Sequence, residues 1–112
     1  MGKKIRLKIG YRDYILSYVK RLTSRKFIGE CEKLGRRDTH DGKIWVKSTL
    51  DTIERLDTEW HEIGHAIFDT QGLNLSDGLE ERIVDSYTHG QILFMKENKD
   101  YMKKFLKDLW EE

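Results

Sequence analysis

The sequence predicts an α+β fold, a small antiparallel β-sheet at the N-terminus followed by helices, and three observations support this class. Apolar and charged residues alternate near the N-terminus, apolar residues recur at helical spacing after residue 50, and the two patterns occupy separate halves of the chain. A chain of 112 residues is too short for two independent cores. We therefore expect a single domain over residues 1–112.

Composition excludes several classes of protein. Aromatic residues make up 11% of the chain, which is atypical of disordered segments, and no apolar run reaches the ~18 residues of a membrane span. The N-terminus has no apolar region typical of a secretory signal, and the single cysteine, Cys31, has no internal disulfide partner. These features predict a cytoplasmic protein without a membrane partner.

Charge gives no indication of a nucleic-acid partner. Lys and Arg number 21 against 20 Asp and Glu, whereas dedicated nucleic-acid binders usually carry a basic excess. Small basic clusters occur, including one in the first strand, but each lies among acids or on a face that would be solvated. We therefore expect no nucleic-acid partner.

Strands are predicted in the first half of the chain. Ile5-Arg6-Leu7-Lys8-Ile9 alternates with the period of a half-buried strand. Residues 27–34 and 43–46 resemble two more short strands, and the Asp41-Gly42 pair between them is typical of a turn. Residues 11–23 fit either a helix or a continued extended segment, and the pattern leaves both open.

Helices are predicted in the second half. Ser48 or Thr49 can cap a first helix that runs to about Asp69 and ends at Gln71-Gly72. Asn74, Ser76 or Asp77 can cap a second helix over about 78–97, and a third begins near Asp100. Each helix carries one apolar stripe, so the first two are expected to pack stripe to stripe.

The first predicted helix contains the motif His61-Glu62-Ile63-Gly64-His65. Residues four apart lie one helical turn apart on one face, so His61 and His65 are candidate ligands for one Zn²⁺ ion. Glu62 lies about 60° beyond His65 on a helical projection, on the side taken to be polar. Its expected role is that of a general base rather than a ligand.

A catalytic zinc site needs a third protein ligand, and the second predicted helix supplies candidates. Glu81 and Asp85 flank its apolar stripe as the histidines flank theirs, so Glu81 is the expected ligand. Asp85 is expected to accept the outer N–H of a ligand histidine, His61 being favoured. Glu80 is the competitor for the ligand position; its projection falls nearer the middle of the apolar face, and Glu81 is preferred.

The remaining titratable residues are less informative. His89 and His40 are interpreted as solvated histidines, although His89 lies one to two turns beyond Asp85, within reach of a substrate. Tyr87 lies on the apolar face of its helix, which favours core packing over a role in oxyanion stabilisation. Cys31 is expected to be a small buried residue.

The chain resembles the ImmA/IrrE-type zinc metallopeptidase-like family, which includes small versions from bacteriophages and bacteria. The resemblance lies in HEIGHAIF, residues 61–68, followed after a short loop by EERIVDSY, residues 80–87, and covers about residues 58–95. It implies a β-rich N-terminal part, an HExxH helix and a following helix with a carboxylate ligand. Val84 and Asp85 stand where the family pattern has Ala and Asn, so the match is closest at Glu81.

Residues and resemblance together predict a zinc-dependent metallopeptidase of the gluzincin type, a hydrolase acting on a peptide or protein. Zn²⁺ held by His61, His65 and Glu81 would activate water, with Glu62 as general base. If the gene belongs to a phage, the expected compartment is the host's cytoplasm. A zinc-bearing interaction module without catalytic activity is the alternative. Substrate, oligomeric state and the physiological metal stay open.

Overall fold

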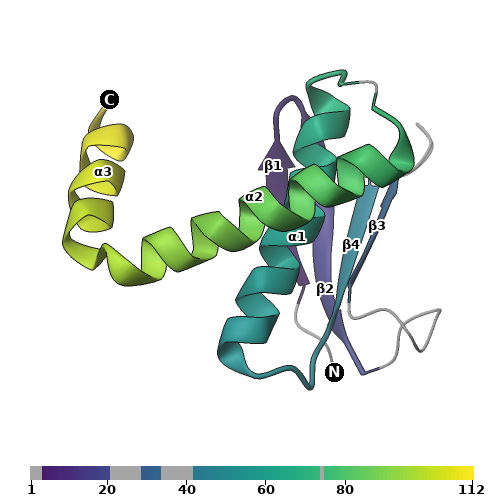
Figure 1. Ribbon diagram of the computed structural model, residues 1–112, viewed down its shortest axis with the longest axis horizontal. Coiled ribbons are helices and arrows are strands. Elements are labelled where there is room, and N and C mark those ends of the chain that lie inside the picture. Colours follow the sequence, from purple (N-terminus) through teal and green to yellow (C-terminus); the bar gives the residue numbers. More distant parts are fainter. Residues whose placement is uncertain (1–3, 21–28, 34–41, 74) are drawn as a thin grey trace.

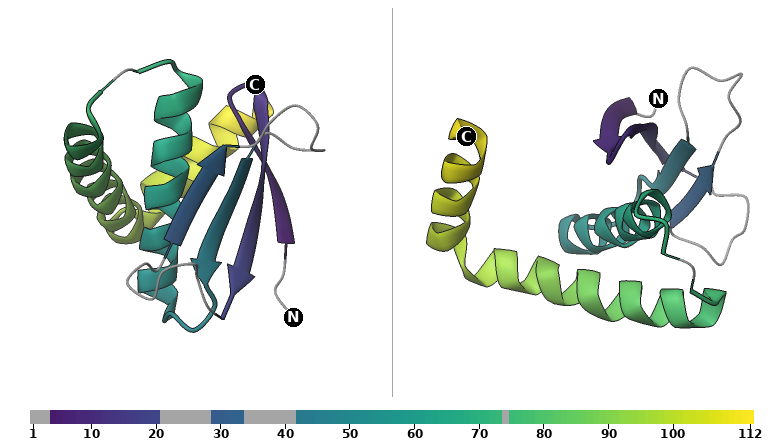
Figure 2. Two further views of the ribbon diagram at one scale, coloured as in Figure 1. Left: turned by 90° about the vertical axis from the view of Figure 1, so that its right-hand side faces the viewer. Right: turned by 90° about the horizontal axis from the view of Figure 1, so that it is seen from above.

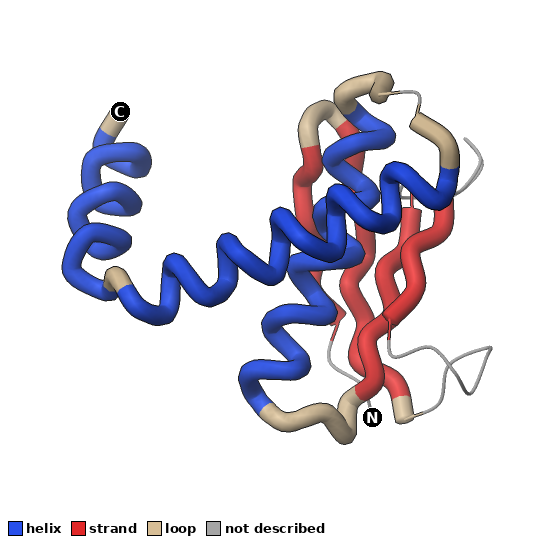
Figure 3. Tube along the Cα trace, in the orientation of Figure 1, coloured by secondary structure: helices blue, strands red, loops and turns tan. Residues whose placement is uncertain are grey.

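The computed structural model describes residues 4–20, 29–33, 42–73 and 75–112. The sheet contains β1 (Lys4–Ile9), β2 (Arg12–Val19), β3 (Gly29–Lys33) and β4 (Gly42–Lys47), and the helices are α1 (Thr52–Thr70), α2 (Asp77–Glu97) and α3 (Lys99–Glu111). Sheet and helices follow one another along the chain (Figures 1 and 3), which confirms the α+β class. No helix in these ranges combines the length and apolar character that crossing a membrane requires.

The sheet is mixed rather than wholly antiparallel, which corrects one part of the prediction. Its strand order is β1-β2-β4-β3; the β1–β2 and β3–β4 pairs are antiparallel, while β2 and β4 run parallel. Alternation of apolar residues reports which face of a strand is buried but carries no information about the direction of its neighbour. For that reason the parallel pair could not be read from the sequence.

Within the ambiguous segment 11–23, Arg12–Val19 forms strand β2, and residues 21–23 lie outside the described residues. Tyr14 and Leu16 are buried in the core with Ile44 and Val46 of β4, while Ile15 faces away from the helices and lines the outer face of the sheet. This two-residue period matches a strand. Gly10, at a φ of +62°, makes the tight turn from β1 into β2.

The N-cap of helix α1 lies three residues after Ser48, the first predicted cap. The N–H of Ser48 still donates to the carbonyl of Val19, so this residue extends the sheet. Asp51 is the N-cap, its carboxylate accepting the N–H of Glu54 at 2.9 Å. The helix ends as predicted, at Gln71 with Gly72 at a φ of +71°.

Helix α1 lies between the sheet and α2, so it is covered on two sides (Figure 2). Ala66 packs in the core with the strands, and Gly64 approaches Val84 and Thr88 of α2 on the other side. The predicted apolar stripe of α1 therefore faces α2: Trp60 and Phe68 line a cavity of about 90 Å³ between the two helices together with Val84. The side toward the sheet was not recognised in the sequence.

Side chains of β2 form polar contacts with two places on α1. Near the C-terminus of α1, Arg12 Nη1 lies 2.7 Å from Asp69 Oδ2. Near its N-terminus, the Tyr18 hydroxyl donates to Glu59, which also accepts from Arg55 Nη1 at 2.8 Å. Burial, followed by the hydrogen bond to the Glu59 carboxylate, raises the pKa of the Tyr18 phenol above its ordinary value.

Candidate metal centre

The candidate metal centre lies where α1 passes the N-terminal end of α2. His61 and His65 stand one turn apart on α1, their rings edge to face with centroids 4.9 Å apart. Ser76 caps α2 by accepting the N–H of Leu79, and its position fixes which carboxylates of the first turns face α1. Two helices with independently set starting points thus supply the two halves of the site.

Glu81 reaches both histidines. Its Oε1 lies 2.7 Å from Nε2 of His61 and its Oε2 lies 2.9 Å from Nε2 of His65. The three residues each offer one donor atom, and these atoms lie within 4.8 Å of one another. A tetrahedral zinc ion with bonds of ~2.0–2.2 Å requires donors ~3.4 Å apart. Two imidazole nitrogens and one carboxylate oxygen this close together could hold a metal ion.

The outer nitrogen of His65 has its own carboxylate. Nδ1 lies 2.6 Å from Oε2 of Glu80, within hydrogen-bond distance. If Nδ1 donates this bond, Nε2 keeps its lone pair for a metal. Glu80 is therefore not placed as the competing ligand that the sequence suggested; it contacts the other side of the same imidazole.

The outer nitrogen of His61 faces Asp85, as predicted, but less closely. Nδ1 of His61 and Oδ1 of Asp85 are 3.6 Å apart, beyond hydrogen-bond distance. The Asp85 side chain is 76% exposed, compared with 25% for Glu80. Of the two outer carboxylates, Glu80 is thus the one held in place.

Glu62 is buried, which corrects the expectation that it lies on a polar side of the helix. Its exposed fraction is 9%, and it shares a side of α1 with Thr58 and Ala66, four residues before and after it. This is the side that packs toward the sheet, so the prediction of a polar environment for Glu62 was wrong. Glu62 is not part of the three-residue donor group.

The other candidate residues lie apart from the donor group. His89 Nδ1 lies 3.1 Å from Asp57 Oδ1 of α1, in a contact on the surface. Tyr87 is 65% exposed, so the prediction that it packs in the core was wrong; α1 covers only part of the apolar stripe of α2. Cys31 belongs to β3, and His40 lies outside the described residues.

The sequence did not predict two features of the site: the role of Glu80, which it suggested only as a competing ligand, and the close approach of the helices at Gly64. The signal for Glu80 is that a ligand histidine usually donates its outer N–H to a second group, and Glu80 is a carboxylate directly beside the expected ligand Glu81. The signal for Gly64 is that glycine destabilises a helix interior by ~0.5–1 kcal/mol relative to alanine. A glycine inside a helical pattern therefore often marks a place where another element packs closely. A Cβ at Gly64 would stand 2.9 Å from Cγ2 of Thr88.

Comparison with protein-family models, curated proteins and solved structures finds no match to this chain. The arrangement of side chains between α1 and α2 is therefore the basis for assigning a function.

Proposed function

We propose that the protein is a zinc-dependent peptidase whose ion would be held by His61, His65 and Glu81. The observation that carries the proposal is the convergence of both Nε2 atoms of an HExxH helix on one carboxylate, at 2.7 and 2.9 Å. The donor set of two imidazoles and one carboxylate is typical of catalytic zinc sites, which keep a position open for water or substrate. The bond from His65 to Glu80 supports the same interpretation, because ligand histidines usually bond a second group.

A bound zinc ion supplies two effects, polarisation of the scissile carbonyl group and a lowering of the pKa of water to about 7. Glu62 would accept the proton that the attacking water loses and pass it to the amine as the C–N bond breaks. Its low exposure shields the carboxylate from bulk water, which suits a group that holds a proton between two steps.

A second candidate is a zinc-bearing module without catalysis. The specific observation in its favour is the same burial of Glu62, on the side of α1 that packs toward the sheet, because a buried carboxylate can serve packing rather than proton transfer. The ligands and the metal would be the same in both cases. Only the chemistry assigned to Glu62 separates the two candidates.

The test is the variant Glu62→Gln, which keeps the size of the side chain but removes its basic carboxylate. We expect about one zinc ion per chain by elemental analysis in both proteins, and peptide hydrolysis reduced by ~10²- to 10⁴-fold in the variant. Glu54→Gln, an exposed change in the first turn of the same helix, is the matched control and should alter neither quantity.

Each other outcome has a defined meaning. Equal hydrolysis by wild type and Glu62→Gln would exclude Glu62 as the general base. Zinc binding without cleavage of any member of a broad peptide library or of candidate protein partners would favour the non-catalytic module. Wild-type protein that takes up no zinc would overturn the metal site itself.

A further inference from the structure

Helix α3 packs little against the rest of the described chain. None of its residues is buried, and α2 carries it away from the sheet so that it stands apart from α1 (Figures 1 and 2). It meets α2 through Tyr101, whose ring packs edge to face on Phe94 with centroids 5.9 Å apart. A helix of 13 residues is marginal by itself in water, so α3 needs further packing to be stable.

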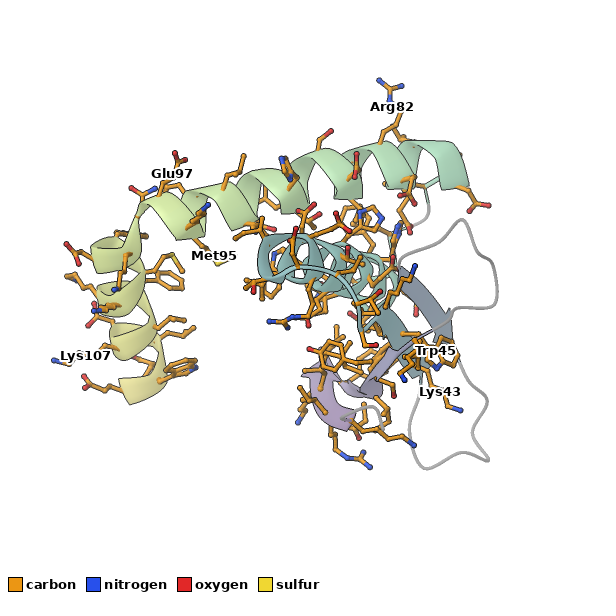
Figure 4. All side chains as sticks on the ribbon, turned by 90° about the horizontal axis from the view of Figure 1, so that it is seen from below. Lys43, Trp45, Arg82, Met95, Glu97 and Lys107 are labelled. Atoms are coloured by element: carbon orange, nitrogen blue, oxygen red, sulfur yellow. The ribbon has the colours of Figure 1, made fainter. Side chains whose placement is uncertain are left out.

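The inner side of the bend between α2 and α3 is an apolar groove of about 640 Å³. Its lining includes Trp60, Phe94, Met95, Tyr101, Phe105 and Leu106, which come from all three helices. Figure 4 shows Met95 on the inner side of the bend, whereas Glu97 and Lys107 point away from it. The apolar face of α3 is thus turned toward a space that α1 and α2 leave unfilled.

The exposed aromatic area along α2 and α3 matches what a dimer interface requires. Tyr87, Phe94, Tyr101, Phe105 and Trp110 are each between 46% and 77% exposed. At 150–250 Å² for a whole aromatic residue, they present about 600 Å² together. One side of a standard interface covers ~800 Å², of which about 65% is apolar in homodimers. The exposed aromatic area on α2 and α3 is therefore comparable with the apolar area of one side of such an interface.

Charge favours a second copy over a lipid surface. Residues 99–112, which are α3 and the following Glu112, contain four lysines and four acidic residues, so this segment has no net charge that would attract it to anionic lipid. The whole chain has a formal charge of +1, so two copies repel each other little. Closed two-fold dimers are also the commonest oligomers of soluble proteins.

We propose that two copies of this chain form a dimer in which α3 of each copy lies in the α2–α3 groove of the other. The same surface of each copy then forms the interface, and the partner covers the apolar face of α3. The candidate metal centre lies at the opposite end of α2, so this proposal does not depend on the proposed function.

The experiment is sedimentation equilibrium of the full chain at ~1–100 µM, at or above the µM to pM dissociation constants of standard-sized interfaces, with a reductant present to exclude disulfides through Cys31. We expect wild type at twice the chain mass of 13.4 kDa. Phe105→Glu on α3 and Tyr87→Glu on α2 should each raise the dissociation constant ~30-fold or more. Lys103→Glu, which introduces the same residue at an exposed position outside the groove, is the matched control and should stay dimeric.

Tyr87→Glu keeps the test valid if Phe105→Glu unfolds α3, and the far-ultraviolet circular dichroism spectrum of each variant reports on the integrity of the fold. Monomeric wild type across this concentration range would overturn the proposal. So would a dimer that both glutamate variants leave intact, because its interface would lie elsewhere. Monomeric wild type that sediments with phosphatidylcholine–phosphatidylglycerol vesicles would identify lipid as the occupant instead.

Discussion

The two ends of α2 differ in how completely the chain covers them. Near its N-terminus α2 lies against α1, burying Val84 and Thr88, and holds the carboxylates that meet the histidines. Beyond Gln91, which accepts a hydrogen bond from Trp60 at 2.9 Å, Leu93 and Phe94 are 41% and 49% exposed. The first end is fixed by packing within one chain, whereas the second presents its apolar side chains to solvent. The apolar side chains of one helix are therefore packed within the chain at one end and exposed to solvent at the other.

The largest effects are expected at the N-terminal end, where Glu81, Glu80 and Asp85 can be removed in turn. Glu81→Ala deletes a donor and should lower zinc affinity by more than ~100-fold. Glu80→Ala should lower it ~10- to 100-fold, because Glu80 holds the outer nitrogen of His65 at 2.6 Å. Asp85→Ala should lower zinc affinity by a smaller factor, because Oδ1 of Asp85 lies 3.6 Å from Nδ1 of His61. Competition with a chromogenic chelator measures all three affinities.

Glu97→Ala, an exposed change at the far end of the same helix, is the control for that series and should leave zinc affinity unchanged. A loss from Asp85→Ala larger than that from Glu80→Ala would reverse the assignment of the outer carboxylates. Zinc affinity unaffected by Glu81→Ala would remove this residue from the ligand set.

The next effect concerns the close approach of α1 and α2, which has no counterpart at the other end of α2. In Gly64→Ala the new Cβ would stand 2.9 Å from Cγ2 of Thr88 and 3.0 Å from Cγ1 of Val84. Both neighbours are buried and β-branched, so neither can move easily. We expect a loss of ~1–3 kcal/mol in the free energy of unfolding, measured by urea denaturation.

A second substitution tests the cause of that loss. Thr88→Ser removes Cγ2 but keeps the hydroxyl that donates to the carbonyl of Val84, so it should recover part of the stability in the Gly64→Ala background. Gly78→Ala is the control, because a Cβ there has nothing within 4 Å. Additive effects of Gly64→Ala and Thr88→Ser would show that the contact does not limit the approach of the helices.

The sequence predicted those parts of the molecule that depend on local periodicity. The i,i+4 spacing of His61 and His65 and the position of Glu81 on its own helix were enough to anticipate which residues converge. The burial of Glu62 depends on the sheet lying behind α1, and the exposure of Tyr87 depends on how far α1 extends along α2. Neither follows from a pattern within one helix. The parallel pairing of β2 with β4 escaped prediction for the same reason.

The smallest predicted effect is on the side of α1 that faces the sheet, where Tyr18 joins β2 to Glu59. The pKa of its phenol is raised in the folded protein by burial and by the hydrogen bond to Glu59. Above about pH 10 the unfolded chain loses this proton before the folded chain does, so stability falls as pH rises. Tyr18→Phe should cost ~0.5–1.5 kcal/mol at pH 8, and this difference should shrink between pH 9 and pH 11. Thermal unfolding at the three pH values measures it, with Tyr11→Phe, at a tyrosine that is 72% exposed, as the control. A cost for Tyr18→Phe that stays constant or grows over this range would mean that the hydroxyl of Tyr18 does not hold its proton more tightly in the folded state.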